Sequence, residues 1–349
     1  MSVYDPTQQF NEQLRALFHD THPQEGPLVV VPHGKRFRRL IDHNYWKDFD
    51  VQETTDGMGT KGYFHWLMDT LEYGVQDAFA MPTGDNIEGG FIPIHLQSHL
   101  LIQQQDEEKI LRIIKKLRDL CVENAWKTLD GRNYPIAITG GETAIMNTLQ
   151  GFELGVTATG YVRKGEGVLP NIQVGDALLG LGSSGLHANG YSFYLDALNK
   201  RNVTLTNFLS ELGEDFVKPT HVYLPAIKEL LQHLREYIHG MVHITGNGFS
   251  KLRELMPTED IDIEVGRTHS LKPQKLFWYG YEELGMSPQD MYRRLNNGVG
   301  FVVAIEQTKA EQALSILRKY FRSDVIGQAV KGRGRILIES EYQKETIIF

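Results

Sequence analysis

The chain has 349 residues, of which 41% are hydrophobic and 23% charged, so we expect two globular domains. Its formal net charge of −8 excludes a general nucleic-acid binder, because affinity for a phosphate backbone comes from clustered Lys and Arg. No apolar run reaches the ~18 residues that span a bilayer and the N-terminus lacks a signal-peptide core, so we expect a cytoplasmic protein without a membrane partner.

Helical and β-like runs follow one another without strict alternation, which favours an α+β fold over a doubly wound parallel sheet. Apolar spacing predicts helices at residues 7–18, 62–73, 107–126, 222–234 and 310–320. The β-like runs predict strands at residues 27–31, 49–53, 136–139, 157–162, 177–181, 261–265, 299–305 and 336–339. The only cysteine, Cys121, falls in a predicted helix and is expected in the core. The Gly- and Pro-rich segment 164–170 predicts a boundary between domains at residues 1–165 and 171–349.

An acid, two glycines, a hydroxyl and a lysine occur together at residues 56–61. Asp56 can hold Mg²⁺, the glycines let backbone N–H groups approach phosphate oxygens, and Lys61 can neutralise phosphate charge. The same residue types also form ordinary tight turns. The segment therefore indicates nucleotide chemistry only if other segments support it.

Further acids in the first half could complete a magnesium site. The segment 139–144, T-G-G-E-T-A, follows a predicted strand and presents Glu142 at a glycine turn. With Asp56, Asp77 and Asp85 it could bind Mg²⁺, although this ion usually takes only one or two protein carboxylates, so not all four need be ligands. Asp77 and Asp85 could instead cap helices or turns.

Two groups of basic or aromatic nitrogen side chains also stand out in the first half. Residues 33–39, H-G-K-R-F-R-R, form either a solvated loop or a site for one anionic ligand. His95 and His99 are four residues apart, as zinc ligands on a helix would be. Because no third ligand is evident, we interpret them as packed or surface histidines.

In the second half, Gly180, Gly182 and Gly185 form a G-x-G-x-x-G string after a predicted strand. A nicotinamide site is disfavoured, because the next helix starts only after Gly190 and the next β-like run, 203–206, ends without an acid. We interpret residues 182–189 instead as a ligand cradle that offers His187 and Asn189. Segment 239–248 similarly brings His243 and Thr245 to a glycine turn and a helix start, where free N–H groups can bind anions.

Taken in order, these segments resemble the AIR synthetase (phosphoribosylformylglycinamidine cyclo-ligase) family, within a wider group that includes thiamine-monophosphate kinase and selenophosphate synthetase. The resemblance covers most of the chain. The least generic strings are G-S-S-G-L-H-A-N-G-Y-S at 182–192 and M-Y-R-R-L-N-N-G-V-G at 291–300. The others are D-G-M-G-T-K at 56–61, A-M at 80–81 with Asp85, Gly90 and Pro93, G-G-E-T-A at 140–144, P-T at 219–220 with Tyr223, and H-I-T-G-N-G at 243–248.

The resemblance implies a two-domain α+β fold, with an N-terminal sheet that forms the interface of a homodimer and a C-terminal α/β sandwich domain. It implies ATP- and Mg²⁺-dependent ring closure of formylglycinamidine ribonucleotide to aminoimidazole ribonucleotide in purine biosynthesis. Such chemistry depends on positioning and charge neutralisation more than on a protein nucleophile, which agrees with the residue types in the motifs.

The resemblance also implies roles for single residues. Catalytic roles fall to His187, Lys61 and Asp85, with proton transfer by His187 as our hypothesis. Mg²⁺ would be bound by Asp56, Asp85 and Glu142. The ATP phosphates would meet Asp56, Gly57, Gly59, Thr60, Lys61, Gly141, Glu142 and Thr143. The ribonucleotide substrate would meet Ser183, Ser184, Gly185, His187, Asn189, His243, Thr245 and Asn296.

The chain departs from the family pattern mainly in its first half. The family has a glycine-rich loop ahead of the segment at 56–61, and this chain has the basic segment 31–39 there, so Lys35 and its neighbours would have to cover the phosphates. Gly84, Ile92, Ser98 and Ile145 replace polar family residues. Three interpretations follow: an active cyclo-ligase, another ATP-using enzyme of the same fold, or a nucleotide-binding dimer without catalysis.

Overall fold

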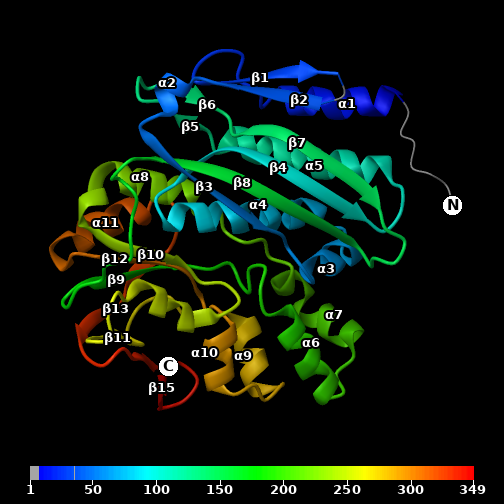
Figure 1. Cartoon of the computed structure of the whole chain (residues 1–349). Coiled ribbons are helices and arrows are strands. Elements are labelled where there is room, and N and C mark those ends of the chain that lie inside the picture. The colour runs from blue at the N-terminus through cyan, green and yellow to red at the C-terminus, as the bar shows by residue number, and fades with distance from the viewer. Residues whose placement is uncertain (1–7, 35) are drawn as a thin grey trace. The chain divides into compact units, whose positions relative to one another are not determined.

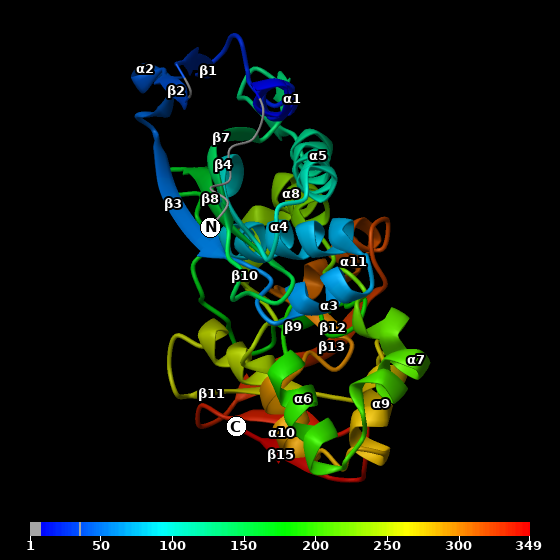
Figure 2. The same cartoon turned by 90° about the vertical axis from the view of Figure 1, so that its right-hand side faces the viewer.

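The computed structural model describes residues 8–34 and 36–349. The chain divides into two compact units, unit 1 at Met1–Gly167 and unit 2 at Val168–Phe349. The division falls inside the Gly- and Pro-rich segment 164–170. Both units combine helices with sheets (Figures 1 and 2), which confirms the α+β class.

The described part of unit 1 contains a four-stranded sheet in the order β3–β8–β4–β7, where β4 and β7 are parallel and the other pairs are antiparallel. The strands are β3 (Phe49–Asp56), β8 (Phe152–Arg163), β4 (Ile92–Ile102) and β7 (Ala137–Ile145). One face packs against α4 (Leu71–Glu88) and α5 (Glu107–Glu123), which buries Cys121 as expected. On the other face, alternate residues such as Glu53, Thr55 and Gln97 are exposed.

The basic segment forms a β-hairpin of β1 (Leu28–His33) and β2 (Arg36–Ile41), so most of the expected loop is paired strand. The hairpin turns at Gly34, whose φ of 60° lies in the left-handed region. Helix α1 (Gln8–His19) precedes the hairpin in the chain, and α2 (His43–Trp46) follows it. A separate pair of short strands is formed by β5 (Trp126–Lys127) and β6 (Asn133–Tyr134).

The helix expected at residues 62–73 is two helices, α3 (Lys61–Leu67) and the start of α4. Asp69 lies between them with a left-handed φ of 52°, which interrupts the helix. The apolar spacing in the sequence continues past this residue. The alternative that Asp77 and Asp85 cap helices or turns is wrong, since both lie inside α4. Most residues of α4 are buried, and a helix buried on most sides lacks the one-sided apolar stripe by which helices are recognised.

Unit 2 contains a seven-stranded sheet in the order β10–β12–β9–β13–β11–β14–β15 among its described residues. All residues of β12 are buried, so this strand lies at the centre of the core. The strands are β9 (Ala177–Gly182), β10 (Ile238–His243), β11 (Ile261–Val265), β12 (Val299–Ile305), β13 (Ser323–Lys331), β14 (Ile336–Glu339) and β15 (Thr346–Ile348). The bounds of β11, β12 and β14 confirm the sequence predictions.

Unit 2, all of which the structure describes, also contains six α-helices. They are α6 (Tyr191–Lys200), α7 (Leu205–Phe216), α8 (Leu224–Leu234), α9 (Lys275–Glu282), α10 (Pro288–Arg294) and α11 (Ala310–Leu317), with 3₁₀ turns η1 (Arg235–Tyr237), η2 (Gly248–Leu255) and η3 (Gln307–Lys309). The strand expected at 203–206 is wrong. Thr204 accepts a hydrogen bond from the Asn207 amide and caps α7, so a β-branched run serves here as a helix start. Among the described residues, no helix has both the length and the apolar character needed to cross a membrane.

Candidate functional site

In unit 1 the segment at residues 56–61 joins the end of β3 to the start of α3. An Asp56 carboxylate oxygen, Oδ1, accepts a hydrogen bond of 2.7 Å from the Gly57 amide, and Glu153 Oε1 on β8 accepts one of 3.1 Å from the Met58 amide. Burial raises the pKa of Glu153, backbone N–H groups of Gly59 and Met58 oppose this, and Asp56 adds to it. The segment is therefore a turn held by two carboxylates.

Two glycines in this turn have different surroundings. A Cβ on Gly57 would stand 2.2 Å from Glu153 Oε1, so a side chain here would displace the Glu153 carboxylate. Gly59 has a φ of 54° and nothing within 4 Å of an added Cβ. Glycine thus permits the close contact with Glu153 at the first position and the left-handed backbone at the second, where an added Cβ would face open space.

Lys61 lies in the interior of unit 1. Its ammonium is 2.9 Å from each carboxylate oxygen of Asp77, and the second oxygen is 2.7 Å from His65 Nε2. All three side chains have 0% exposure. Burial lowers the pKa of Lys61 and Asp77 opposes that change. The structure places the Lys61 ammonium in an internal ion pair and gives Asp77 the role of its countercharge.

We expect Asp77→Asn to lower the free energy of unfolding by about 3 to 5 kcal/mol, because it leaves a buried ammonium without a countercharge. Urea unfolding followed by intrinsic fluorescence measures this. The matched control is Asp69→Asn, whose 63% exposed side chain pairs with Lys109 and Arg112 and should cost less than about 1 kcal/mol. Equal losses in the two variants would contradict the buried ion pair.

The expected magnesium ligands Asp56, Asp85 and Glu142 do not share a site within one chain. Asp85 is half-buried inside α4, and Glu142 is exposed on β7. Strands β8 and β4 separate β3 from β7, so Asp56 and Glu142 lie three strand spacings apart, roughly 14 Å. Among the described residues, no three His, Cys, Asp or Glu side chains are grouped as a metal centre.

The glycine turn expected at residues 139–144 is also absent from the structure. Strand β7 continues through Gly140, Gly141, Glu142 and Thr143 to Ile145, because each of these residues pairs in parallel with β4. Gly141 and Thr143 therefore occupy strand positions beside Glu142. This places the segment at the edge of the sheet, away from the turn after β3.

The basic hairpin lies apart from the turn at 56–61. Figures 1 and 2 show β1 and β2 at the opposite end of unit 1 from α3, and Lys35 itself lies outside the described residues. Arg39 Nη1 lies 2.6 Å from His95 Nε2. Burial lowers the pKa of His95 to about 3, and the Arg39 charge adds to this. As expected, His95 is packed and His99 is on the surface.

In unit 2 the cradle at residues 182–189 follows β9 and is held by Asn296. Ser183 Oγ donates to Asn296 Oδ1 at 2.9 Å, and Asn296 Nδ2 donates to the Gly185 carbonyl at 2.8 Å. Ser184 Oγ donates to the Pro219 carbonyl. Asn296 lies three residues before the start of β12, so the loop after β9 is fastened to the segment that leads into the neighbouring strand. The structure thus brings together predicted residues from three segments.

His187, a residue of this cradle, is buried. Its side chain is 1% exposed and its backbone has a φ of 62°. The Ser184 amide donates to His187 Nε2 at 3.4 Å. Ring centroids of His221, Tyr223 and His243 lie 6.1, 5.9 and 6.2 Å from that of His187. His187 and His243, predicted from separate segments, therefore belong to one buried aromatic cluster.

Asn189 and Thr245 lie nearer the surface, and both are half-buried. A Cβ on Gly246 would stand 3.2 Å from Asn189 Oδ1, so the cradle meets the turn that follows β10. Asn189 Nδ2 is buried and has no hydrogen-bond partner among the described residues. Buried donors are nearly always paired, so this amide is a candidate contact for a ligand.

The buried histidines predict a loss of stability in acid. Burial lowers the pKa of His243 to about 3, and the Lys251 charge adds to this. Such an imidazole stays neutral in the folded chain but gains a proton below about pH 6.5 once unfolded, so stability falls as the pH falls from 6.5 towards 3. Between pH 7 and 5 we expect His243 to lower the free energy of unfolding by about 2 kcal/mol.

Urea unfolding at pH 7, 6 and 5 tests this expectation. His243→Gln removes the titration, so its stability should fall by about 2 kcal/mol less over this range than that of the unchanged protein. His233→Gln, at an exposed position on α8, is the control. The same pH dependence in the His243 variant and in the unchanged protein would show that His243 does not remain neutral when folded.

Several residues of these sites were not assigned from the sequence. Glu153 is one glutamate in an alternating strand, and nothing in its own segment indicates contact with a turn almost 100 residues earlier. His65 and His221 lack a spacing signal as well. Tyr223 belongs to a recognised string, but its role appears only in the structure, where its hydroxyl donates to the Gly182 carbonyl at 2.9 Å.

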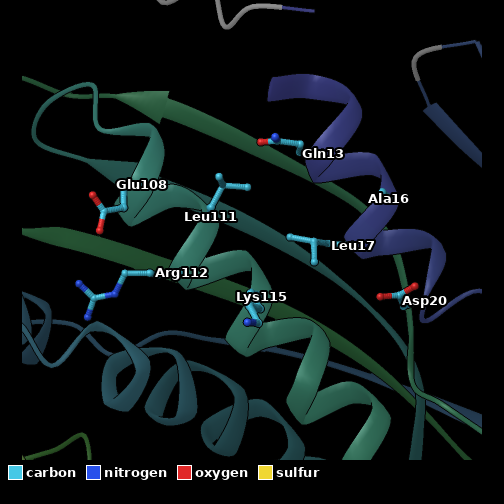
Figure 3. Close-up of a pocket in the computed structure, with 8 residues that line it drawn as sticks. All are labelled: Gln13, Ala16, Leu17, Asp20, Glu108, Leu111, Arg112 and Lys115. Atoms are coloured by element: carbon cyan, nitrogen blue, oxygen red, sulfur yellow. The ribbon is translucent and has the colours of Figure 1, made fainter. Parts of the chain in front are cut away.

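A groove elsewhere in unit 1 lies between α1 and α5 (Figure 3). Leu17 and Leu111 form part of its apolar floor, and charged side chains such as Asp20 and Lys115 stand at its margin. None of the predicted site residues that the structure describes lines it. Arg112, on its margin, already binds Glu72 through two hydrogen bonds of 2.8 and 3.0 Å. The groove is therefore separate from the candidate site.

Solved structures with related folds support the architecture. Hydrogenase maturation protein HypE of E. coli matches with a TM-score of 0.64 and 18% identity over 98% of this chain and 96% of that one. Thiamine-monophosphate kinase of Stenotrophomonas maltophilia matches with a TM-score of 0.60 and 16% identity over 95% and 96%. Residues 173–339 match the family model of the AIR synthase related protein, C-terminal domain. Fold and motifs together define an AIR synthase related protein.

Sequence relatives narrow the assignment. The protein of Pyrococcus horikoshii named phosphoribosylformylglycinamidine cyclo-ligase is 31% identical over 308 residues, which cover 87% of this chain and 85% of the relative. Its namesakes in Thermococcus gammatolerans and Bacillus mycoides are 32% and 31% identical, and each match covers 81–82% of both chains. The chain belongs to the phosphoribosylformylglycinamidine cyclo-ligase family.

Proposed function

We propose that the protein uses ATP to close formylglycinamidine ribonucleotide into aminoimidazole ribonucleotide. ATP phosphorylates the formyl oxygen, the amidine nitrogen attacks the same carbon, and phosphate leaves as the imidazole ring forms, with ADP as the second product. The observation that carries the proposal is identity above 30% with cyclo-ligases over more than four fifths of both chains. The joined segments at 182–189 and 243–248 support it from the structure.

The turn at 56–61 would receive the ATP phosphates on its open side, beside Gly59 and Thr60, because the Gly57 and Gly59 amides already donate to Asp56 and Glu153. Lys61 would act from the interior by holding the start of α3 rather than by facing solvent. Mg²⁺ needs only one or two protein carboxylates when phosphates and water complete its shell, and Asp56 beside these amides fits that need. When bound there, Mg²⁺ would neutralise triphosphate charge. Asp85 and the exposed Glu142 would then not bind the same ion as Asp56. Glu142, Gly141 and Thr143 would contact ATP at a place apart from the turn.

The substrate side would be the cradle of unit 2. Asn189 Nδ2 offers an unused donor, Thr245 stands beside it on the neighbouring turn, and Ser183, Ser184 and Gly185 shape the loop that Asn296 fastens. The side chains of His187 and His243 are buried. The buried ring cluster would thus set the shape of the cradle, and its outer amides and hydroxyls would contact the ribonucleotide.

We further propose a homodimer that works in the cytoplasm. The face of the unit 1 sheet opposite α4 carries exposed residues, among them Val51 at 57% exposure. A second copy of the same sheet would cover this face. A single buried cysteine is compatible with a reducing compartment.

The first test measures ADP release in ATP and Mg²⁺, with and without formylglycinamidine ribonucleotide, while the aminoimidazole product is followed. We expect ADP release that depends on the substrate and equals the product formed. ADP release without stimulation would indicate another substrate for an enzyme of this fold. Nucleotide binding without ADP release would indicate a binding protein that has lost catalysis.

If His187 transfers a proton during ring closure, His187→Gln should lower kcat by about 10²- to 10⁴-fold with little change in the KM for ATP. Steady-state kinetics measure this, and thermal unfolding separates lost chemistry from lost folding, because His187 is buried with a positive φ. His233→Gln is the control at an exposed position. Full turnover in the His187 variant would exclude the role.

A further inference from the structure

Glu153 contacts the phosphate-binding turn from another strand. It lies near the start of β8, and its Oε1 accepts a hydrogen bond of 3.1 Å from the Met58 amide. The Gly59 amide is a further donor to the same carboxylate. A carboxylate that accepts two backbone N–H groups fixes the direction of the peptide units that carry them. Glu153 therefore restrains the middle of the turn, between Asp56 and the start of α3.

The packing of Gly57 supports this restraint independently. An added Cβ at this position would stand 2.2 Å from Glu153 Oε1 and 3.2 Å from the Leu154 carbonyl oxygen. The Glu153 carboxylate therefore lies directly over the backbone of the turn. A Cβ added to Gly59 would meet nothing within 4 Å, so this side of the turn is open. One side of the turn is thus held by β8 while the other remains accessible.

We propose that Glu153 is a positioning residue, whose carboxylate holds the turn at residues 56–61 in the conformation that receives the ATP phosphates. The inference rests on the proposed function, because it assigns the turn to ATP. Glu153 acts through the backbone amides of Met58 and Gly59 and contacts neither the nucleotide nor the metal ion.

The first experiment compares Glu153→Ala with Glu153→Gln. Binding of a non-hydrolysable ATP analogue with Mg²⁺ is measured by calorimetry, and KM values are measured for both substrates. We expect Glu153→Ala to raise the Kd and the KM for ATP about tenfold and to change the KM for formylglycinamidine ribonucleotide less than about twofold. Glu153→Gln keeps an acceptor oxygen and should recover most of the affinity. Glu123→Ala, at an exposed position on α5, is the control.

A double-mutant cycle with Gly57→Ala tests the contact itself. The new Cβ displaces the Glu153 carboxylate, so Gly57→Ala should weaken nucleotide binding about as much as Glu153→Ala does. The double variant should then be no weaker than either single variant. Independent effects would instead multiply to about a hundredfold. Thermal unfolding of each variant confirms that it is folded at the assay temperature.

The outcomes separate this inference from the proposed function. The role of Glu153 alone would be overturned in either of two cases, provided that the unchanged protein turns over normally. In the first, the losses of nucleotide affinity in the two single variants multiply in the double variant. In the second, Glu153→Ala changes the KM values of both substrates equally. If the unchanged protein binds the analogue but forms no aminoimidazole product, the proposed function is contradicted. The double-mutant cycle can still be measured in that case, because it depends on binding of the analogue alone. An unchanged protein that does not bind the analogue would overturn both.

Discussion

An ammonium group without access to water requires a countercharge, and in unit 1 this requirement joins Lys61 to Asp77. Lys61 is the first residue of α3 and the last of the glycine-containing turn, while Asp77 lies in the middle of the buried helix α4. The pair therefore fixes one end of the turn to the core of the unit. His65, on the second oxygen of Asp77, links the same carboxylate to α3 once more.

The other end of the turn is fixed by the sheet. Asp56 is still a residue of β3, paired with Val156 on β8, and Glu153 reaches over the turn from the same strand. A segment held at both ends and in the middle loses little conformational freedom when a ligand binds, so more of the contact energy is available for affinity. In unit 2, Asn296 has the corresponding effect on the cradle, because its amide bonds to both Ser183 and Gly185.

Much of the fold could be predicted because strong local signals and the structure agree. The β-branched runs at 261–265 and 299–305 are strands, and the apolar spacing near Cys121 is a helix. The misses have physical causes. Helix α4 is buried on most sides, so its sequence has no polar face that would show the helical period. The chain turns at Asp69, although the apolar spacing continues past this residue. Gly140 and Gly141 lie in strand β7 because they pair with β4.

The candidate site was predictable to a different extent in each unit. Residues 182–189 and 243–248 follow strands β9 and β10, each a neighbour of β12 in one sheet, so their strings indicated the residues that the fold brings together. The inward direction of Lys61 could not be predicted, because a lysine after glycine and threonine suits either a phosphate or a buried acid. Glu153 could not be found either, since its role depends on the pairing of β3 with β8.

That pairing also bears on how the chain folds during synthesis. Residues 49–56 of β3 pair with residues 156–163 of β8, and β8 is the last strand of unit 1. Contacts between segments so far apart in sequence form late, because a long loop must close first. As the chain leaves the ribosome, β3 therefore remains without its partner strand until β8 has been synthesised. The turn beside Asp56 rests against the first residues of β8, so it takes its final shape only when the whole unit has been made.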